Sequence, residues 1–249
     1  YRIYGLLTVP NGQVPEDGFP TILFLHGYVR PDTYQPTAQY VGSQDALARS
    51  GFVTFKPDLR GHGRSEGIAS GGLFSEAYTV DALNAISALE NYEPADGNRV
   101  GLWGHSNGGA TGLRVMTITD KVKAGVFWAG VVGSYPDLLE TYYEDMPFMP
   151  LISRQVLADH GMPSENPDYW LPIDPFAYLA NVSEPIQLHH GTADMDVPFE
   201  LSIILRDALL AEDKQVELYQ YDGADHNLNG PAFGQAMAAT IAFFAKHLQ

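Results

Sequence analysis

The 249-residue chain contains no cysteine, and this absence excludes several kinds of chemistry. Disulfide bonds, cysteine-ligated zinc sites and thiol nucleophiles are all impossible. A chain of this length buries about 70–75% of its unfolded surface on folding, so it needs no cross-links to be stable. We therefore expect a single domain over residues 1–249.

Positive charge and long apolar runs are also scarce. The chain has 14 Lys and Arg residues against 30 Asp and Glu residues, which gives a net charge of -16 and a pI near 4.6. Such a surface repels nucleic acids and anionic membranes. The longest apolar run, residues 124–133, is too short to cross a bilayer. We expect neither a nucleic-acid partner nor a membrane partner.

The sequence lacks an initiator methionine, because it begins at Tyr1. It also contains no stretch that resembles a signal peptide. We expect that a leader was removed, which favours a secreted or periplasmic location, while a cytoplasmic location stays open. The oligomeric state cannot be predicted from these features.

Short apolar runs alternate with helical patterns along most of the chain. The runs are nearly continuous in apolar residues, which is typical of parallel strands covered on both faces. This alternation predicts an α/β fold with a mainly parallel central sheet flanked by helices. The expected strands are residues 2–9, 21–26, 52–57, 99–104, 124–129, 185–190 and 216–221, and the expected helices are residues 38–49, 74–91, 107–117, 199–212 and 231–248.

Residues 133–184 interrupt the alternation. This stretch is rich in Tyr, Pro, Asp and Met, and it is too long for an ordinary connection between a strand and a helix. We interpret it as a helical lid inserted into the sheet domain.

Ser106 lies in the sequence "GHSNG", between a predicted strand and a predicted helix. A sharp turn at that point lifts the serine Oγ above the edge of the sheet, and flanking glycines let the backbone pass without Cβ clashes. A nucleophilic serine needs a base and an acid. His226 follows strand 216–221, and Asp194 and Asp196 follow strand 185–190, so all three lie just past strand ends. One of the two aspartates would serve as the acid, and the other would cap helix 199–212.

The chain resembles the α/β-hydrolase superfamily over nearly its whole length. The matching segments are "FLHGY" (24–28), "PDLRGHGRSEG" (57–67), "GHSNGG" (104–109), "HGTADMDVP" (190–198) and "GADHNL" (223–228). The phrase "PFAYLANVSEPIQLHHGTAD" is similar to one in the prolyl-oligopeptidase-type and feruloyl-esterase-type branch. Two departures are Asn107, where Tyr, Gln or Met is commoner, and the lack of a propeller in the sequence.

The resemblance implies catalytic roles for Ser106 as nucleophile, Asp194 as acid and His226 as base. It also implies an oxyanion hole formed by the backbone N–H groups of Tyr28 and Asn107. No metal and no organic cofactor are implied.

Aromatic residues near these segments are candidates for substrate binding. We expect Tyr28 and Trp128 to contact the substrate, because their strands point toward the site. The aromatic residues of the insertion could line a pocket or pack in a core; they are Tyr135, Tyr142, Tyr143 and Trp170.

These features favour a serine esterase that cleaves aryl or short-to-medium acyl esters as small-molecule substrates. A serine peptidase or amidase would use the same three residues, and the missing propeller and modest insertion favour esters over peptides. A polyester hydrolase and an inactive binding module are weaker alternatives, since the set of Ser106, Asp194 and His226 is intact.

Overall fold

A seven-stranded sheet forms the centre of the computed structural model, which describes residues 1–69 and 72–248. The strands are β1 (Gly5–Thr8), β2 (Phe19–Leu25), β3 (Val53–Pro57), β4 (Ala95–His105), β5 (Val122–Trp128), β6 (Ile186–Gly191) and β7 (Val216–Tyr221). Their order across the sheet is β1-β3-β2-β4-β5-β6-β7. β1 pairs with β3 in antiparallel fashion and all other neighbours are parallel. The predicted α/β architecture is therefore confirmed.

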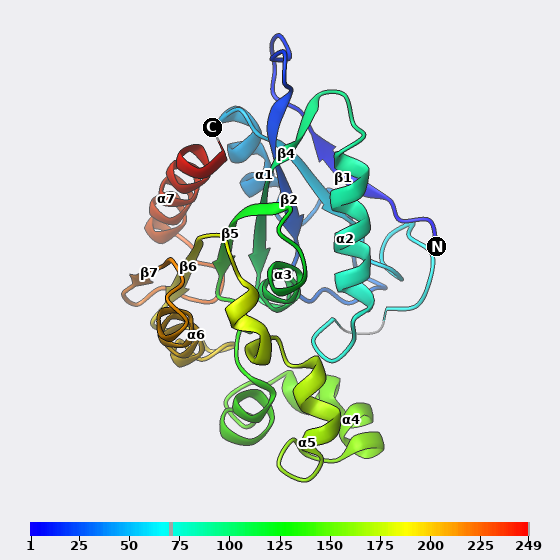
Figure 1. Ribbon diagram of the computed structural model, residues 1–249, viewed down its shortest axis with the longest axis vertical. Helices are drawn as coiled ribbons and strands as arrows, with labels where there is room; N and C mark the ends of the chain where they lie inside the picture. The colour runs from blue at the N-terminus through cyan, green and yellow to red at the C-terminus, as the bar shows by residue number, and fades with distance from the viewer. Residues whose placement is uncertain (70–71, 249) are drawn as a thin grey trace.

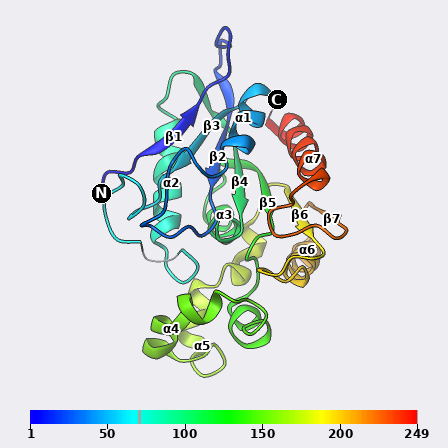
Figure 2. The same cartoon turned by 180° about the vertical axis from the view of Figure 1, so that it is seen from behind.

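Helices cover both faces of this sheet (Figure 1). The longer ones are α1 (Val41–Arg49), α2 (Ala77–Leu89), α3 (Asn107–Ile118), α6 (Glu200–Ala211) and α7 (Pro231–Leu248). Apolar side chains of α2, α3 and α6 pack against one face and form a buried core with β2, β4 and β6. Those of α1 and α7 pack against the other face, which is turned toward the viewer in Figure 2.

The central strands have the sequence that this two-sided packing requires. β2 is buried at every position, and so are the last six residues of β4 and six of the seven residues of β5. Burial of apolar side chains on both faces contributes about 25 cal/mol per Å² of apolar surface, which stabilises these strands in the middle of the sheet. β4, β6 and β7 run parallel, so the loops that follow them meet at one edge.

Residues 133–184 connect β5 to β6, and their part with η1 (Asp137–Thr141), α4 (Met149–His160) and α5 (Pro167–Trp170) lies beyond that edge in both views (Figures 1 and 2). They also include η2 (Leu171–Ile173) and η3 (Pro175–Asn181). Apolar side chains up to Trp170 form a separate buried cluster with Leu73, Ala110, Val197 and Leu201. Leu179 and Val182, in and just after η3, belong instead to the core that α2, α3 and α6 form on the sheet. The insertion is thus anchored to the sheet domain by its own core, and its action as a lid stays a prediction.

Within residues 1–69 and 72–248, none of the helices combines the length and the apolar character needed to span a membrane.

Candidate active site

Ser106 occupies a strained turn between β4 and α3. Its backbone has φ 54° and ψ -120°, a conformation that residues other than glycine rarely adopt. Its N–H donates to the Trp128 carbonyl at 3.0 Å, and its carbonyl accepts the N–H of Gly109 and of Val131. The glycine after this turn is required because neighbouring backbone lies close to it. A Cβ at Gly108 would lie 2.1 Å from the Leu25 carbonyl oxygen. Tight packing therefore keeps the serine in this conformation.

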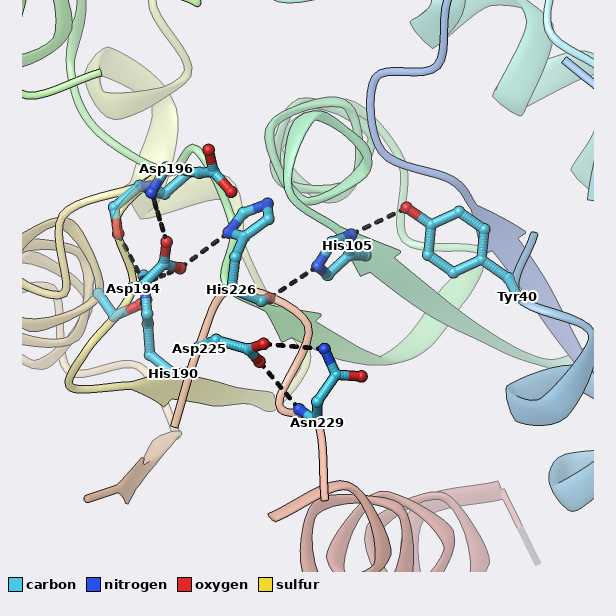
Figure 3. Close-up of polar contacts among 10 residues, drawn as sticks. Tyr40, His105, His190, Asp194, Asp196, Asp225, His226 and Asn229 are labelled. Carbon is cyan, nitrogen blue, oxygen red and sulfur yellow. Dashed lines mark hydrogen bonds and ion pairs between the residues drawn. The ribbon is translucent and has the colours of Figure 1, made fainter. Parts of the chain in front are cut away.

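His226 and Asp194 form the polar pair beside this turn (Figure 3). His226 lies in the loop between β7 and α7, and its Nδ1–H donates to Asp194 Oδ2 at 2.8 Å. Asp194 follows β6, and its carboxylate is fully buried. The hydrogen bond leaves Nε2 of the neutral His226 ring as the acceptor, which is the form a general base requires.

The Asp194 carboxylate accepts four hydrogen bonds. Oδ2 accepts from His226 and from His190 Nε2 at 3.0 Å, and Oδ1 accepts the N–H groups of Asp196 and Val197, both at 2.9 Å. Burial by itself would raise the pKa of Asp194, but the hydrogen bonds from His190 and His226 outweigh it and lower the pKa below its usual range. The carboxylate is therefore ionised at neutral pH.

One cavity of about 460 Å³ contains both Ser106 and His226 in its lining. Its wall is largely apolar and comes from the loop before α2, from the segment after β5 and from α4; those residues include Leu73, Phe74, Val131, Phe148, Ile152 and Val156. In the described part of the chain, no hydrogen bond joins Ser106 to the His226 ring, although both residues line this cavity. Such bonds often tighten only in the substrate complex. The arrangement can support attack by a serine on a carbonyl group bound against the apolar wall.

The two residues expected to form the oxyanion hole come from different elements. Asn107 is the first residue of α3, so its N–H has no acceptor within the helix, and the positive end of the helix dipole lies there. Tyr28 follows Gly27, whose N–H is taken by the Tyr40 hydroxyl at 2.9 Å. Tyr28 and Asn107 both line the cavity with Ser106. Their placement fits the predicted oxyanion hole, which stays a proposal.

The two aromatic residues expected to bind substrate lie in different environments. Tyr28 is 50% exposed and lines the cavity. Trp128 is only 2% exposed, and its Nε1–H donates to Thr240 Oγ1 in the core under α7. The described residues that line the cavity with Ser106 do not include Trp128, so the structure gives its expected substrate contact no support there, and that contact stays a prediction. The side chain points into the sheet–helix interface because apolar packing there buries a large indole.

Four aromatic residues of the insertion that were candidates for substrate binding pack in the third apolar core, whereas Phe148 of the insertion lines the Ser106 cavity. Tyr135 and Trp170 are almost completely buried, and Tyr142 and Tyr143 pack against the same cluster.

Asp196 does not cap the following helix as its position suggested. α6 begins after Phe199 without a side-chain cap, and the backbone N–H of Asp196 serves Asp194 instead. Oxygen and nitrogen atoms of Asp194, Asp196 and His226 lie within 4.8 Å of one another, a spacing that could suit a metal ion. Asp194 and His226 also bind each other directly within this group.

His190 is a site residue that the sequence did not reveal. Its ring is fully buried, and Nε2 lies 3.0 Å from both Asp194 Oδ2 and the Val197 carbonyl oxygen. A carbonyl can only accept, so Nε2 carries the hydrogen, while Nδ1 lies 2.7 Å from the Ser202 hydroxyl. The sequence "HHG" at the end of a buried strand resembles packing residues, and only the fold brings His190 next to the acid.

The chain is similar to several known proteins. YtmA of Bacillus subtilis, named as an uncharacterized peptidase, is 27% identical over 226 residues, which cover 90% of this chain and 81% of that protein. YitV of the same organism, which carries a provisional name as an esterase, is 26% identical over 242 residues, covering 92% and 89%. The solved acylaminoacyl peptidase of Pyrococcus horikoshii has the same fold, with a TM-score of 0.81 and 24% identity over 98% of this chain. The chain spans only 39% of the length of that solved chain. The absence of a propeller from the given sequence is therefore no argument for esters over peptides.

The sheet order and the serine turn are those of the α/β-hydrolase fold, and the family match places the chain among serine hydrolases. Residues 39–249 match the model of the prolyl oligopeptidase family, and the chain belongs to that family.

Proposed function

We propose that this serine hydrolase cleaves carboxylic esters through an acyl-enzyme on Ser106. His226 Nε2 removes the proton from Ser106 Oγ, and Oγ attacks the ester carbonyl. The N–H groups of Tyr28 and Asn107 hold the resulting oxyanion, and His226 gives the proton to the departing alcohol. A water molecule, activated by the same histidine, then releases the acid. The observation that carries the proposal is the Asp194–His226 hydrogen bond at 2.8 Å, whose histidine lines the same cavity as Ser106.

The apolar wall favours esters with a hydrocarbon or aryl acyl group. Side chains such as Leu73, Phe74 and Ile152 can cover an acyl chain, which gains about 0.8 kcal/mol for each buried CH₂ group. The provisional name of YitV as an esterase supports the same choice.

Peptide or amide hydrolysis is the second candidate. It is favoured by the family to which the chain belongs and by the name of YtmA as a peptidase. The same three residues would serve, with His226 protonating an amine instead of an alcohol.

Substrates with the same acyl group separate the two candidates. We expect a higher kcat/KM for ethyl butyrate and 4-nitrophenyl butyrate than for butyramide and for matched peptide 4-nitroanilides. The unactivated ethyl ester is included because activated aryl esters also react with peptidases. Comparable or higher kcat/KM values for the amides would contradict the ester proposal and support the peptidase.

We also propose that residues 133–184 act as a lid that sets the size of the acyl group. Ile152 and Val156 of α4 line the cavity, so the double variant Ile152→Ala/Val156→Ala should enlarge it. We expect the preference among 4-nitrophenyl esters to move toward longer chains, while kcat/KM for the acetate changes little. Each additional CH₂ group of the acyl chain that the enlarged cavity buries should raise kcat/KM about fourfold.

Leu151→Ala is the matched control, because Leu151 belongs to the same helix and is 68% exposed. An unchanged chain-length profile in the double variant would overturn the lid proposal.

A further inference from the structure

A chain of hydrogen bonds joins three loops of the candidate site through two side chains with no role so far (Figure 3). The Gly27 N–H donates to the Tyr40 hydroxyl at 2.9 Å, and this hydroxyl lies 2.9 Å from His105 Nδ1. His105 Nε2 lies 3.0 Å from the carbonyl oxygen of His226. This series of hydrogen bonds thus runs from Gly27, the residue before Tyr28, to the backbone of His226.

The direction of these bonds follows from the groups involved. The carbonyl of His226 can only accept, so Nε2 of His105 carries the hydrogen and Nδ1 of the neutral ring is an acceptor. The Tyr40 oxygen already accepts from Gly27, so its own hydrogen is available for Nδ1. Burial lowers the pKa of His105 to about 3 and raises the pKa of Tyr40 to about 12. Both side chains therefore stay neutral from mildly acidic to mildly basic pH, and the bonds keep one direction.

The surroundings of the two rings leave little freedom. His105 is buried directly before Ser106, and its ring centroid is 4.7 Å from that of His226. Tyr40 packs edge-on against Phe24 and Trp103. A Cβ on Gly27 would lie 2.7 Å from the Tyr40 oxygen and 3.1 Å from His105 Nδ1.

Tyr40 also has strained backbone. Its φ of 63° lies in the left-handed region, where a residue with a bulky side chain is uncommon, and it immediately precedes α1. Strain of this kind costs of order 1–3 kcal/mol and persists where the surrounding structure imposes it. Tyr40 is therefore both the residue with strained backbone and the residue whose hydroxyl joins Gly27 to His105.

We propose that Tyr40 and His105 are positioning residues, which hold the backbone of His226 and the Gly27–Tyr28 loop in register with Ser106. This inference rests on the proposed roles of Ser106, His226 and the Tyr28 N–H. Neither side chain touches the substrate. Both act by keeping the base and the oxyanion donor at fixed distances from the serine, where a misplacement of about 1 Å can lower the rate about 100-fold.

The test compares Tyr40→Phe with the matched control Tyr221→Phe. Tyr221 is also a buried tyrosine whose hydroxyl lies 2.8 Å from a histidine Nδ1, that of His189, but this pair belongs to the core. Two reactions are measured. Turnover of 4-nitrophenyl butyrate gives kcat and KM, and nitrophenolate release from a 4-nitrophenyl alkylphosphonate gives the phosphonylation rate. In the second reaction the Ser106 Oγ–P bond forms and nitrophenolate leaves, so it reports the site without depending on the natural substrate.

We expect Tyr40→Phe to lower kcat and the phosphonylation rate together by about 10- to 100-fold, with KM nearly unchanged. Tyr221→Phe should keep both rates close to wild type. His105→Gln can still donate and accept, so it should retain more activity than His105→Leu. Melting temperatures of all variants are measured, and Tyr40→Phe decides the result if the His105 variants do not fold, because it keeps the ring.

Equal rates in Tyr40→Phe and Tyr221→Phe would overturn the positioning role, as would a loss confined to KM. Failure of the proposed function has different signatures. If Ser106 is not the nucleophile, the wild-type enzyme itself is not labelled on Ser106; if the enzyme is a peptidase, the wild type is labelled and the phosphonylation rates still test the positioning role.

Discussion

Replacing Ser106 with alanine should lower kcat for the preferred ester by about 10⁶-fold. The variant keeps the small side chain that the strained turn accommodates but has no oxygen to attack the carbonyl. The turnover that remains would come from the N–H groups of Tyr28 and Asn107 and from binding in the cavity, about 10³–10⁴ above the reaction in water. Steady-state kinetics with 4-nitrophenyl butyrate measures the loss.

Covalent labelling identifies the nucleophile independently of turnover. An organophosphonate should add one covalent mass to the wild-type protein and none to Ser106→Ala. Ser50→Ala is a suitable control, because the Ser50 hydroxyl only bonds the Ala46 carbonyl at the end of α1. A label on any residue other than Ser106 would contradict the assignment of the nucleophile.

The fold could be predicted because its signals are local. The near-continuous apolar runs of β2, β4 and β5 are what a strand buried on both faces needs, and such strands occur in parallel sheets covered by helices. The turn at Ser106 could be predicted for the same reason, since "GHSNG" places glycines where the backbone of β2 and α3 comes close.

The supporting contacts could not be predicted, because they join residues that are far apart in the sequence. His105 and His226 are 121 positions apart, and Tyr40 and His105 are 65 apart. No spacing pattern in the sequence indicates that the His190 ring turns toward Asp194. Nor does any pattern indicate that the Trp128 ring turns toward Thr240. Which face a side chain takes at the last residue of a strand depends on the local twist and on the neighbouring loops. The clearest example is the set of four hydrogen bonds that converge on Asp194, the aspartate that the resemblance implied as the acid.

Asp194→Asn should lower kcat by about 10⁴-fold, by the precedent of triads that lose the acid which sets the histidine tautomer. The four groups that face this carboxylate are all donors: His226, His190 and the N–H groups of Asp196 and Val197. A carboxamide has only one acceptor oxygen, so its NH₂ group must face two of these donors. If NH₂ faces the histidines, His226 turns to the tautomer with hydrogen on Nε2 and can no longer accept the Ser106 proton. If NH₂ faces the backbone, two N–H groups lose their acceptor, which costs about 1–3 kcal/mol each.

Asp196→Asn is the matched comparison, because it makes the same chemical change two residues further along the loop. Asp196 gives its backbone N–H to Asp194, and the asparagine keeps that N–H. Its side chain is exposed and lines the cavity, so KM can change while kcat and the melting temperature stay close to wild type. Steady-state kinetics and melting curves of Asp194→Asn and Asp196→Asn show which aspartate is the acid. If Asp196→Asn proves to be the inactive variant and Asp194→Asn keeps its kcat, then Asp194 is not the acid, and the hydrogen bonds that converge on its carboxylate serve the stability of the loop instead.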